Sequence, residues 1–134
     1  MRSKREPGVQ IKTQAQLAKM EEAGRVVASA LHAAADAVAP GVTTADLDAI
    51  ASAQIAAAGA APLFLGYHGF PATICTCINE EIVHGIPSSS RVLAVGDQLG
   101  KLGGDNAYPH GQRRVGVPAV EAGAAVDGDH VALP

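Results

Sequence analysis

The sequence predicts an α/β (α+β) fold in which two helices precede a set of short antiparallel strands. Three observations support it. Apolar residues first recur at helical spacing through the N-terminal third of the chain. A second helical pattern then follows a break at Pro40 and Gly41. After Pro71 the pattern changes to β-branched residues and cysteines, with short polar turns between them.

Length and composition indicate one domain with a thin core. The 134 residues suffice for a single domain, and much of the 48% apolar content is alanine, which buries little area. A formal charge of -3 gives no electrostatic basis for binding nucleic acid or anionic lipid. The most apolar run, residues 49–65, is interrupted by Ser52, Gln54, Gly59 and Pro62, so it is a poor candidate for a membrane span.

The first helix is predicted from about Gln14 to Val38, after a polar and flexible N-terminus of residues 1–12. Thr13 and Gln16 have the spacing of a capping box. The apolar positions at helical spacing are Leu17, Met20, Ala23, Val27, Leu31, Ala35 and Val38. Pro40 and Gly41 should end the helix.

A second helix is predicted to begin at Thr43 or Thr44, either of which could supply the N-cap. Asp46 would lie in its first turn, where a carboxylate interacts favourably with the helix dipole. One face carries Leu47, Ile50, Ala51, Ile55 and Ala58. Gly59 should end the helix.

The β-rich part should begin after an irregular but packed connection over residues 62–71. A strand is predicted over Thr73–Ile78. Alternation would place Ile74, Thr76 and Ile78 on one face and Thr73, Cys75 and Cys77 on the other. Residues 79–81 fit a solvated turn.

A return strand is predicted at Ile82 and Val83, and it would place His84 at its end. Gly85 and Pro87 should stop this strand. Residues 88–90 then form a loop, and residues 92–95 a short apolar segment.

Residues 64–87 form the candidate functional stretch. They contain both cysteines and both phenylalanines of a chain with only 3% aromatic residues, together with two of its five histidines. His84 could donate to a substrate carbonyl or amide, act as an acid or base, or bind a metal. The alternative is a histidine whose hydrogen bonds are satisfied by the backbone. Phe64, Tyr67 and Phe70 could be ordinary core or the walls of an apolar pocket.

A zinc site is the other chemistry that this stretch suggests. Its donors would be His68, Cys75, Cys77 and His84. The Cys-x-Cys spacing on a strand lacks the turn of a Cys-x-x-Cys zinc knuckle, which disfavours the site. The cysteines are better interpreted as small buried apolar residues, reduced as in a cytoplasmic protein. His68 could equally be a solvent-exposed loop residue.

The amino-acid composition changes after Asp97. Residues 98–134 are rich in glycine and have no sustained periodicity, so we expect a poorly ordered tail. Such an abrupt change is what a reading-frame change or a truncated gene would produce. The predicted organisation is therefore a flexible segment at 1–12, a partial domain at 13–97 and a divergent tail at 98–134.

One long signature resembles a known family. LGYHGFPATIC at 65–75, followed by INEEIVHGIP at 78–87, is similar to the N-terminal half of type I methionine aminopeptidases, which remove the initiator methionine from new proteins. The similarity runs over roughly residues 10–97. It implies the N-terminal half of a pita-bread fold, in which helices cover a curved antiparallel sheet.

The resemblance also implies roles for site residues. His84 would be the catalytic histidine that faces the substrate and hydrogen-bonds near the scissile amide. Phe64, Tyr67, Phe70 and Cys75 would line the pocket for the methionine side chain. The aromatic cluster seen in the sequence and the pocket implied by the family therefore coincide.

The metal centre of the family is not matched. The resemblance implies two divalent ions (cobalt, manganese, iron or zinc) held by two aspartates, a histidine and two glutamates. Here Gln112 follows His110-Gly111 where an aspartate is expected, and the family's remaining ligands lie in a half for which the chain has no room. Asp105, Asp127 and Asp129 lie outside any matching motif. We therefore expect no metal ligands in this chain, no bound metal and no hydrolysis by the chain alone.

The resemblance further implies partners and a location. These are N-terminal methionine peptides or nascent chains in the cytoplasm, with ribosome association as a further expectation. The alternative function is a non-catalytic binding module of the same fold that recognises a peptide or protein. A partial sheet should also leave an open edge, through which the chain could self-associate.

Overall fold

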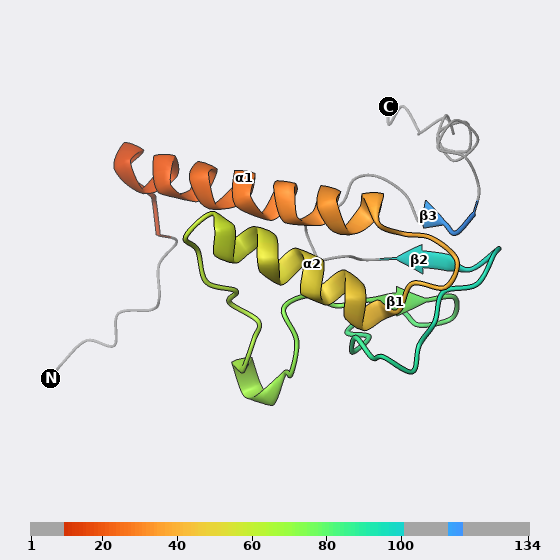
Figure 1. Ribbon diagram of the computed structural model, residues 1–134. Coiled ribbons are helices and arrows are strands. Elements are labelled where there is room, and N and C mark those ends of the chain that lie inside the picture. The colour runs from red at the N-terminus through yellow and green to blue at the C-terminus, as the bar shows by residue number, and fades with distance from the viewer. Residues whose placement is uncertain (1–9, 101–112, 117–134) are drawn as a thin grey trace, which may run out of the picture.

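The computed structural model describes residues 10–100 and 113–116. Its elements, in chain order, are helix α1 (Gln14–Asp36), helix α2 (Thr44–Ala57), the short 3-10 helix η1 (Tyr67–Gly69) and strands β1 (Cys77–Ile78), β2 (Gln98–Gly100) and β3 (Arg113–Arg114). Figure 1 shows α1 and α2 packed side by side. The strands gather beside the C-terminal end of α1 and the N-terminal end of α2, and η1 projects on the side of α2 away from α1.

Helix α1 begins as the sequence predicts. Thr13 is its N-cap, and the reciprocal hydrogen bonds with Gln16 confirm the capping box. The helix ends at Asp36, two residues before the predicted Val38, because the chain leaves helical geometry after the Ala37 C-cap on its approach to Pro40.

Only the C-terminal half of α1 is buried. Ala30, Leu31, Ala34 and Ala35 lie in the core, where they face α2 and the sheet. N-terminal to Ala30, Leu17, Met20 and Val27 are at least 44% exposed although they belong to the same apolar stripe. The periodicity therefore predicts the helix correctly but overstates how much of it packs in this chain.

Helix α2 resolves the choice between two caps. Thr43 is the N-cap, and Asp46 completes a second capping box by accepting the Thr43 backbone N–H at 2.9 Å. The helix ends at Ala57, and Gly59 follows with φ +69°, a left-handed conformation that glycine adopts readily. Leu47, Ala51 and Ile55 are buried, as their spacing predicts.

The sheet is antiparallel with the order β1-β2-β3. Its register pairs Ile78 with Leu99 and Leu99 with Arg113. The predicted strand Thr73–Ile78 is wrong in extent, because only its last two residues join the ladder. Ile74 and Ile78 of one predicted face enter the core, but Thr73, Cys75 and Cys77 of the other face are buried as well.

The predicted return strand at Ile82 and Val83 is wrong. These residues are 83% and 44% exposed and form no strand. The N–H of Ile78 donates to the Glu81 carboxylate at 2.9 Å. A side chain therefore accepts the hydrogen bond that a return strand could have accepted. The backbone then turns through His84 at φ +56°, outside the β region.

Part of the glycine-rich tail belongs to the folded body. Strand β2 starts directly after Asp97, and Leu99 and Val115 are both core residues. The expectation of poor order therefore fails for 98–100 and 113–116. Residues 101–112 and 117–134 lie outside the described structure, as do residues 1–9 of the predicted flexible segment 1–12. Residues 10–12 are described and are exposed.

The core is thin, as the alanine content predicts. Four alanines join eight larger aliphatic residues, of which Leu47, Leu93 and Val115 are almost fully inaccessible. Across residues 10–100 and 113–116, no helix is long and apolar enough to cross a membrane.

Candidate functional site

The predicted aromatic residues lie in one self-closed loop. The N–H of Gly66 donates to the carbonyl of Phe70 at 2.8 Å, and the N–H of Tyr67 donates to the carbonyl of Phe64 at 3.0 Å. Phe70 is half-buried, while Phe64 and Tyr67 remain 37% and 61% exposed. The loop thus presents aromatic surface to solvent instead of burying it in the core.

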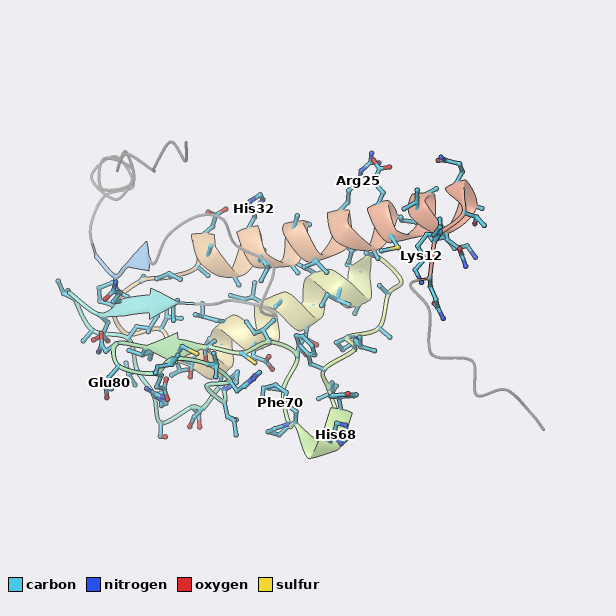
Figure 2. The ribbon with its side chains drawn as sticks, turned by 180° about the vertical axis from the view of Figure 1, so that it is seen from behind. Lys12, Arg25, His32, His68, Phe70 and Glu80 are labelled. Atoms are coloured by element: carbon cyan, nitrogen blue, oxygen red, sulfur yellow. The ribbon has the colours of Figure 1, made fainter. Side chains whose placement is uncertain are left out.

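His68 lies at the outer end of this loop. Figure 2 shows it beyond Phe70, on the part of the loop farthest from α1. Its φ of +47° is left-handed, and its ring meets the Tyr67 ring edge-on with centroids 4.3 Å apart. His68 is exposed, as its loop interpretation predicts.

Cys75 and His84, which follow Pro71 in the sequence, lie side by side. Cys75 is 8% exposed, and its Sγ lies 3.9 Å from Nδ1 of the exposed His84. Cys77 faces the same turn, and its Sγ accepts the N–H of Gly85 at 3.5 Å. A small buried thiol beside an accessible imidazole gives a site with an apolar floor and one polar group that can donate or accept a hydrogen bond.

Gly85 permits the close approach that brings these residues together. Its carbonyl accepts the Thr76 N–H at 2.9 Å. A Cβ at this position would lie 1.9 Å from the Thr76 carbonyl oxygen, so no larger residue fits. The glycine of the His-Gly pair therefore sets the distance between the two backbone segments that carry Cys75 and His84.

Two α2 residues hold the flanks of this site: Asp48, which the sequence did not single out, and Thr44, which it suggested only as a helix cap. Asp48 Oδ1 accepts the backbone N–H groups of Thr73 and Ile74, each at 2.8 Å. Thr44 is fully buried and exchanges two hydrogen bonds with the backbone of Ser88. The available signal was a carboxylate between Leu47 and Ala51, two core positions of the helix.

Glu81 is also more than a solvated turn residue. It forms an ion pair with Arg91, and both side chains are about two-thirds buried, being 30% and 34% exposed. The hydrogen bond from Arg91, with that from the Ile78 N–H, holds the pKa of the Glu81 carboxyl below its ordinary value. The exposed Glu80 nearby is a solvated turn residue, as predicted.

Asp97 bonds both the turn that precedes β2 and the residue that follows β1. Its carboxylate accepts from the Asn79 side chain at 2.9 Å and from the Ala94 N–H at 2.8 Å. These two hydrogen bonds, with Asn79 the stronger contributor, lower the pKa of Asp97. Both carboxylate oxygens thus accept hydrogen bonds.

The described residues do not assemble a metal site. Within 10–100 and 113–116, no three His, Cys, Asp or Glu side chains come close enough to share an ion. Cys75 and His84 meet as a pair, whereas His68 belongs to the separate aromatic loop. His110 and the aspartates at 105, 127 and 129 lie outside the described residues.

Comparison with known proteins places this arrangement in a family. Metallopeptidase family M24 matches residues 18–100, which is more than half of the chain. The chain belongs to metallopeptidase family M24. The matched region contains the aromatic loop, the Cys75–His84 pair and the α2 residues beneath them.

Relatives within this family are methionine aminopeptidases. Methionine aminopeptidase 1 of Mycobacterium tuberculosis is 44% identical over 115 residues, which cover 86% of this chain and 36% of that protein. The Clostridium acetobutylicum enzyme is 52% identical over 87 residues, covering 65% and 35%. A short uncharacterized protein of Micrococcus luteus is 54% identical over 79 residues and is 93% covered.

Solved structures confirm the fold. Methionine aminopeptidase from Thermotoga maritima matches with a TM-score of 0.67 and 34% identity, covering 69% of this chain and 37% of that one. The Rickettsia prowazekii enzyme gives a TM-score of 0.66 at 38% identity and the same coverage. The prediction of a partial pita-bread α+β fold is therefore confirmed. The chain spans only about a third of the aminopeptidases it matches.

Proposed function

We propose that this chain forms the methionine-binding part of a methionine-aminopeptidase-type hydrolase. The observation that carries the proposal is the exposed His84 imidazole, 3.9 Å from the buried Cys75 thiol, within a family M24 domain. The bound groups would be N-terminal methionine peptides or nascent chains. Because the chain covers only about a third of these relatives, the activity of the whole enzyme is itself part of the proposal.

The proposed roles follow from exposure and chemistry. His84 is exposed, so its ring can donate a hydrogen bond to the peptide carbonyl or amide at a substrate N-terminus. Cys75 supplies a polarizable apolar wall that suits a thioether side chain. Phe64, Tyr67 and Phe70 would cover that side chain from the aromatic loop. The exposed area of Phe64 and Tyr67 is surface that such a ligand would bury.

The chain alone should not hydrolyse peptides. Family M24 enzymes are metallopeptidases, and bound divalent ions supply the Lewis-acid chemistry of hydrolysis. The residues described here do not fit such a centre, because no three ligand-type side chains converge among them. Asp97 is committed to Asn79 and Ala94. We therefore derive no hydrolytic step for this chain.

A non-catalytic binding module is the second candidate function. The exposed apolar residues beside His84 favour it, because Ile82 and Ile86 are 83% and 51% accessible. Apolar surface of this kind is typical of contact with another chain. Self-association through the sheet edge and association with ribosomes belong to this candidate. We place either function in the cytoplasm, consistent with two cysteines that form no disulfide.

Two assays on the purified chain test the proposal. The first measures methionine release from a Met-Ala-Ser peptide with manganese, cobalt or ferrous ion, and we expect none. The second measures binding of the same peptide by calorimetry, with a Leu-Ala-Ser peptide for comparison. His84→Ala should weaken binding about tenfold or more, as expected for loss of a hydrogen bond to the ligand.

His32→Ala is the matched control. His32 lies on the outer side of α1, away from the aromatic loop (Figure 2), and is exposed. It should bind the peptide like the parent chain. Metal-dependent release that His84→Ala abolishes would overturn the claim of inactivity. Absence of any methionine-dependent binding would overturn the proposed substrate class and leave the binding of another partner.

A further inference from the structure

Asp48 fixes the backbone that leads into Cys75. Its Oδ1 receives two N–H groups from consecutive residues, Thr73 and Ile74, at 2.8 Å each. Bonds from N–H to a carboxylate are stronger than those between neutral groups. They replace the ladder bonds that these residues would make in the predicted strand. The position of Cys75, one residue later, is therefore set by a side chain of α2.

Thr44 fixes the backbone that follows His84. Its hydroxyl donates to the Ser88 carbonyl at 3.1 Å and accepts the Ser88 N–H at 2.8 Å. The Thr44 N–H also donates to the Arg91 carbonyl at 3.0 Å. Thr44 has no accessible surface, so both hydroxyl bonds are shielded from water.

The two residues are four positions apart on α2. Side chains at i and i+4 lie one above the other on the same helix face. A single face of α2 therefore holds two backbone segments. One precedes Cys75, and the other follows His84. We call Thr44 and Asp48 the α2 pair.

We propose that the α2 pair are positioning residues, which set the geometry of Cys75 and His84 and thereby the affinity for a methionine peptide. The effect on peptide affinity rests on the function proposed above, whereas the effect on the geometry of Cys75 and His84 does not. Neither residue touches the site directly. Each acts through the backbone between its hydrogen bonds and the site, which includes His84 in its left-handed conformation at φ +56°.

The experiment compares four substitutions in the full chain. Asp48→Ala removes the acceptor, and Asp48→Asn retains an amide oxygen at the same place. Thr44→Val removes the hydroxyl at constant shape, and Thr44→Ser retains it. The matched control is Asp46→Ala, two residues from Asp48 on the same helix, because Asp46 serves only the helix cap with Thr43 among the bonds described.

Two readouts separate the inference from the proposed function. The first is the alkylation rate of Cys75 by iodoacetamide, followed by peptide mass spectrometry, which requires no ligand. Release of the segment should expose the thiol and raise this rate about tenfold or more in Asp48→Ala. The second is the dissociation constant of Met-Ala-Ser, which should rise by a similar factor in Asp48→Ala and Thr44→Val.

The expected pattern is rescue by the conservative partner. Asp48→Asn and Thr44→Ser should resemble the parent chain in both readouts, and so should Asp46→Ala. If Asp46→Ala raises the alkylation rate as much as Asp48→Ala does, the effect is general helix stability and the inference is wrong. If the parent chain binds no peptide, the proposed effect on peptide affinity is wrong together with the proposed function. The alkylation rates alone then decide whether the α2 pair positions Cys75.

Discussion

Replacing Gly85 with alanine should disrupt the site by steric overlap alone. The added Cβ would lie 1.9 Å from the carbonyl oxygen and 2.8 Å from the carbonyl carbon of Thr76. Both contacts are with backbone, so no side-chain rotation can relieve them. The segment carrying His84 must move away from β1, and the 2.9 Å hydrogen bond from the Thr76 N–H to the Gly85 carbonyl must lengthen or break.

The size of the effect follows from two contributions. Losing a buried backbone hydrogen bond costs roughly 0.5–1.5 kcal/mol. Moving a packed backbone segment to admit a methyl group costs roughly a further 1–3 kcal/mol. Alanine returns only about 0.4–1 kcal/mol by restricting the unfolded chain. We therefore expect Gly85→Ala to lower the free energy of unfolding by about 0.5–4 kcal/mol.

Gly24→Ala is the control with the opposite sign. Gly24 is an exposed residue inside α1, and apart from its chain neighbours and the backbone of its own helix no atom lies within 4 Å of the position of its added Cβ. Alanine there should raise the free energy of unfolding by about 0.5–1 kcal/mol. Urea unfolding followed by circular dichroism measures both variants. A Gly85→Ala midpoint equal to or above that of the parent chain would refute the steric reasoning.

Four further substitutions test the core and the ion pair. Thr76→Val should raise the free energy of unfolding by about 1 kcal/mol, because Thr76 Oγ1 is buried without a hydrogen-bond partner in the described structure; a lower urea midpoint would contradict this. Folding lowers the pKa of Glu81. Its carboxylate therefore stabilises the fold at pH values above its ordinary pKa of 4.5, and this stabilisation is lost as the pH falls through the pKa of the folded state. Glu81→Gln should therefore flatten the decline in stability on acidification, whereas an unchanged acid profile would show that the Arg91 pair contributes nothing. Leu31→Ala should lower the free energy of unfolding by about 2–5 kcal/mol and Leu17→Gln by less than about 0.5 kcal/mol, since Leu31 is 5% exposed and Leu17 is 44% exposed. Equal losses by urea unfolding would mean that the N-terminal half of α1 is packed.

Local signals were sufficient to predict the helices. The first capping box joins residues only three positions apart, so the interaction of Thr13 with Gln16 could be predicted from spacing alone. The choice between Thr43 and Thr44 could not. It depends on Ser88, which lies 44 residues farther along the chain and gives Thr44 a different partner.

The strands were less predictable because distant groups use their backbone donors. Asp48 accepts the N–H groups of Thr73 and Ile74 across 25 and 26 residues of sequence. The β-branched run therefore starts as a bound loop and becomes a strand only at Cys77. The pairing of β2 with β3 was missed for a related reason: two- and three-residue strands carry no period that a sequence pattern could reveal.

The sequence predicts a candidate stretch that contains both Cys75 and His84, but it does not predict how their side chains are arranged. The sequence brings Cys75 and His84 within nine residues of each other, and the structure brings their side chains to 3.9 Å. That distance depends on Gly85, which admits the close approach, and on the α2 pair, which holds both flanks. All of these residues lie within the part matched by family M24. The local geometry around His84 is thus fixed by residues of this chain itself, although it spans only about a third of the aminopeptidases it matches. The proposed binding of a methionine peptide can therefore be tested on this chain separately from hydrolysis.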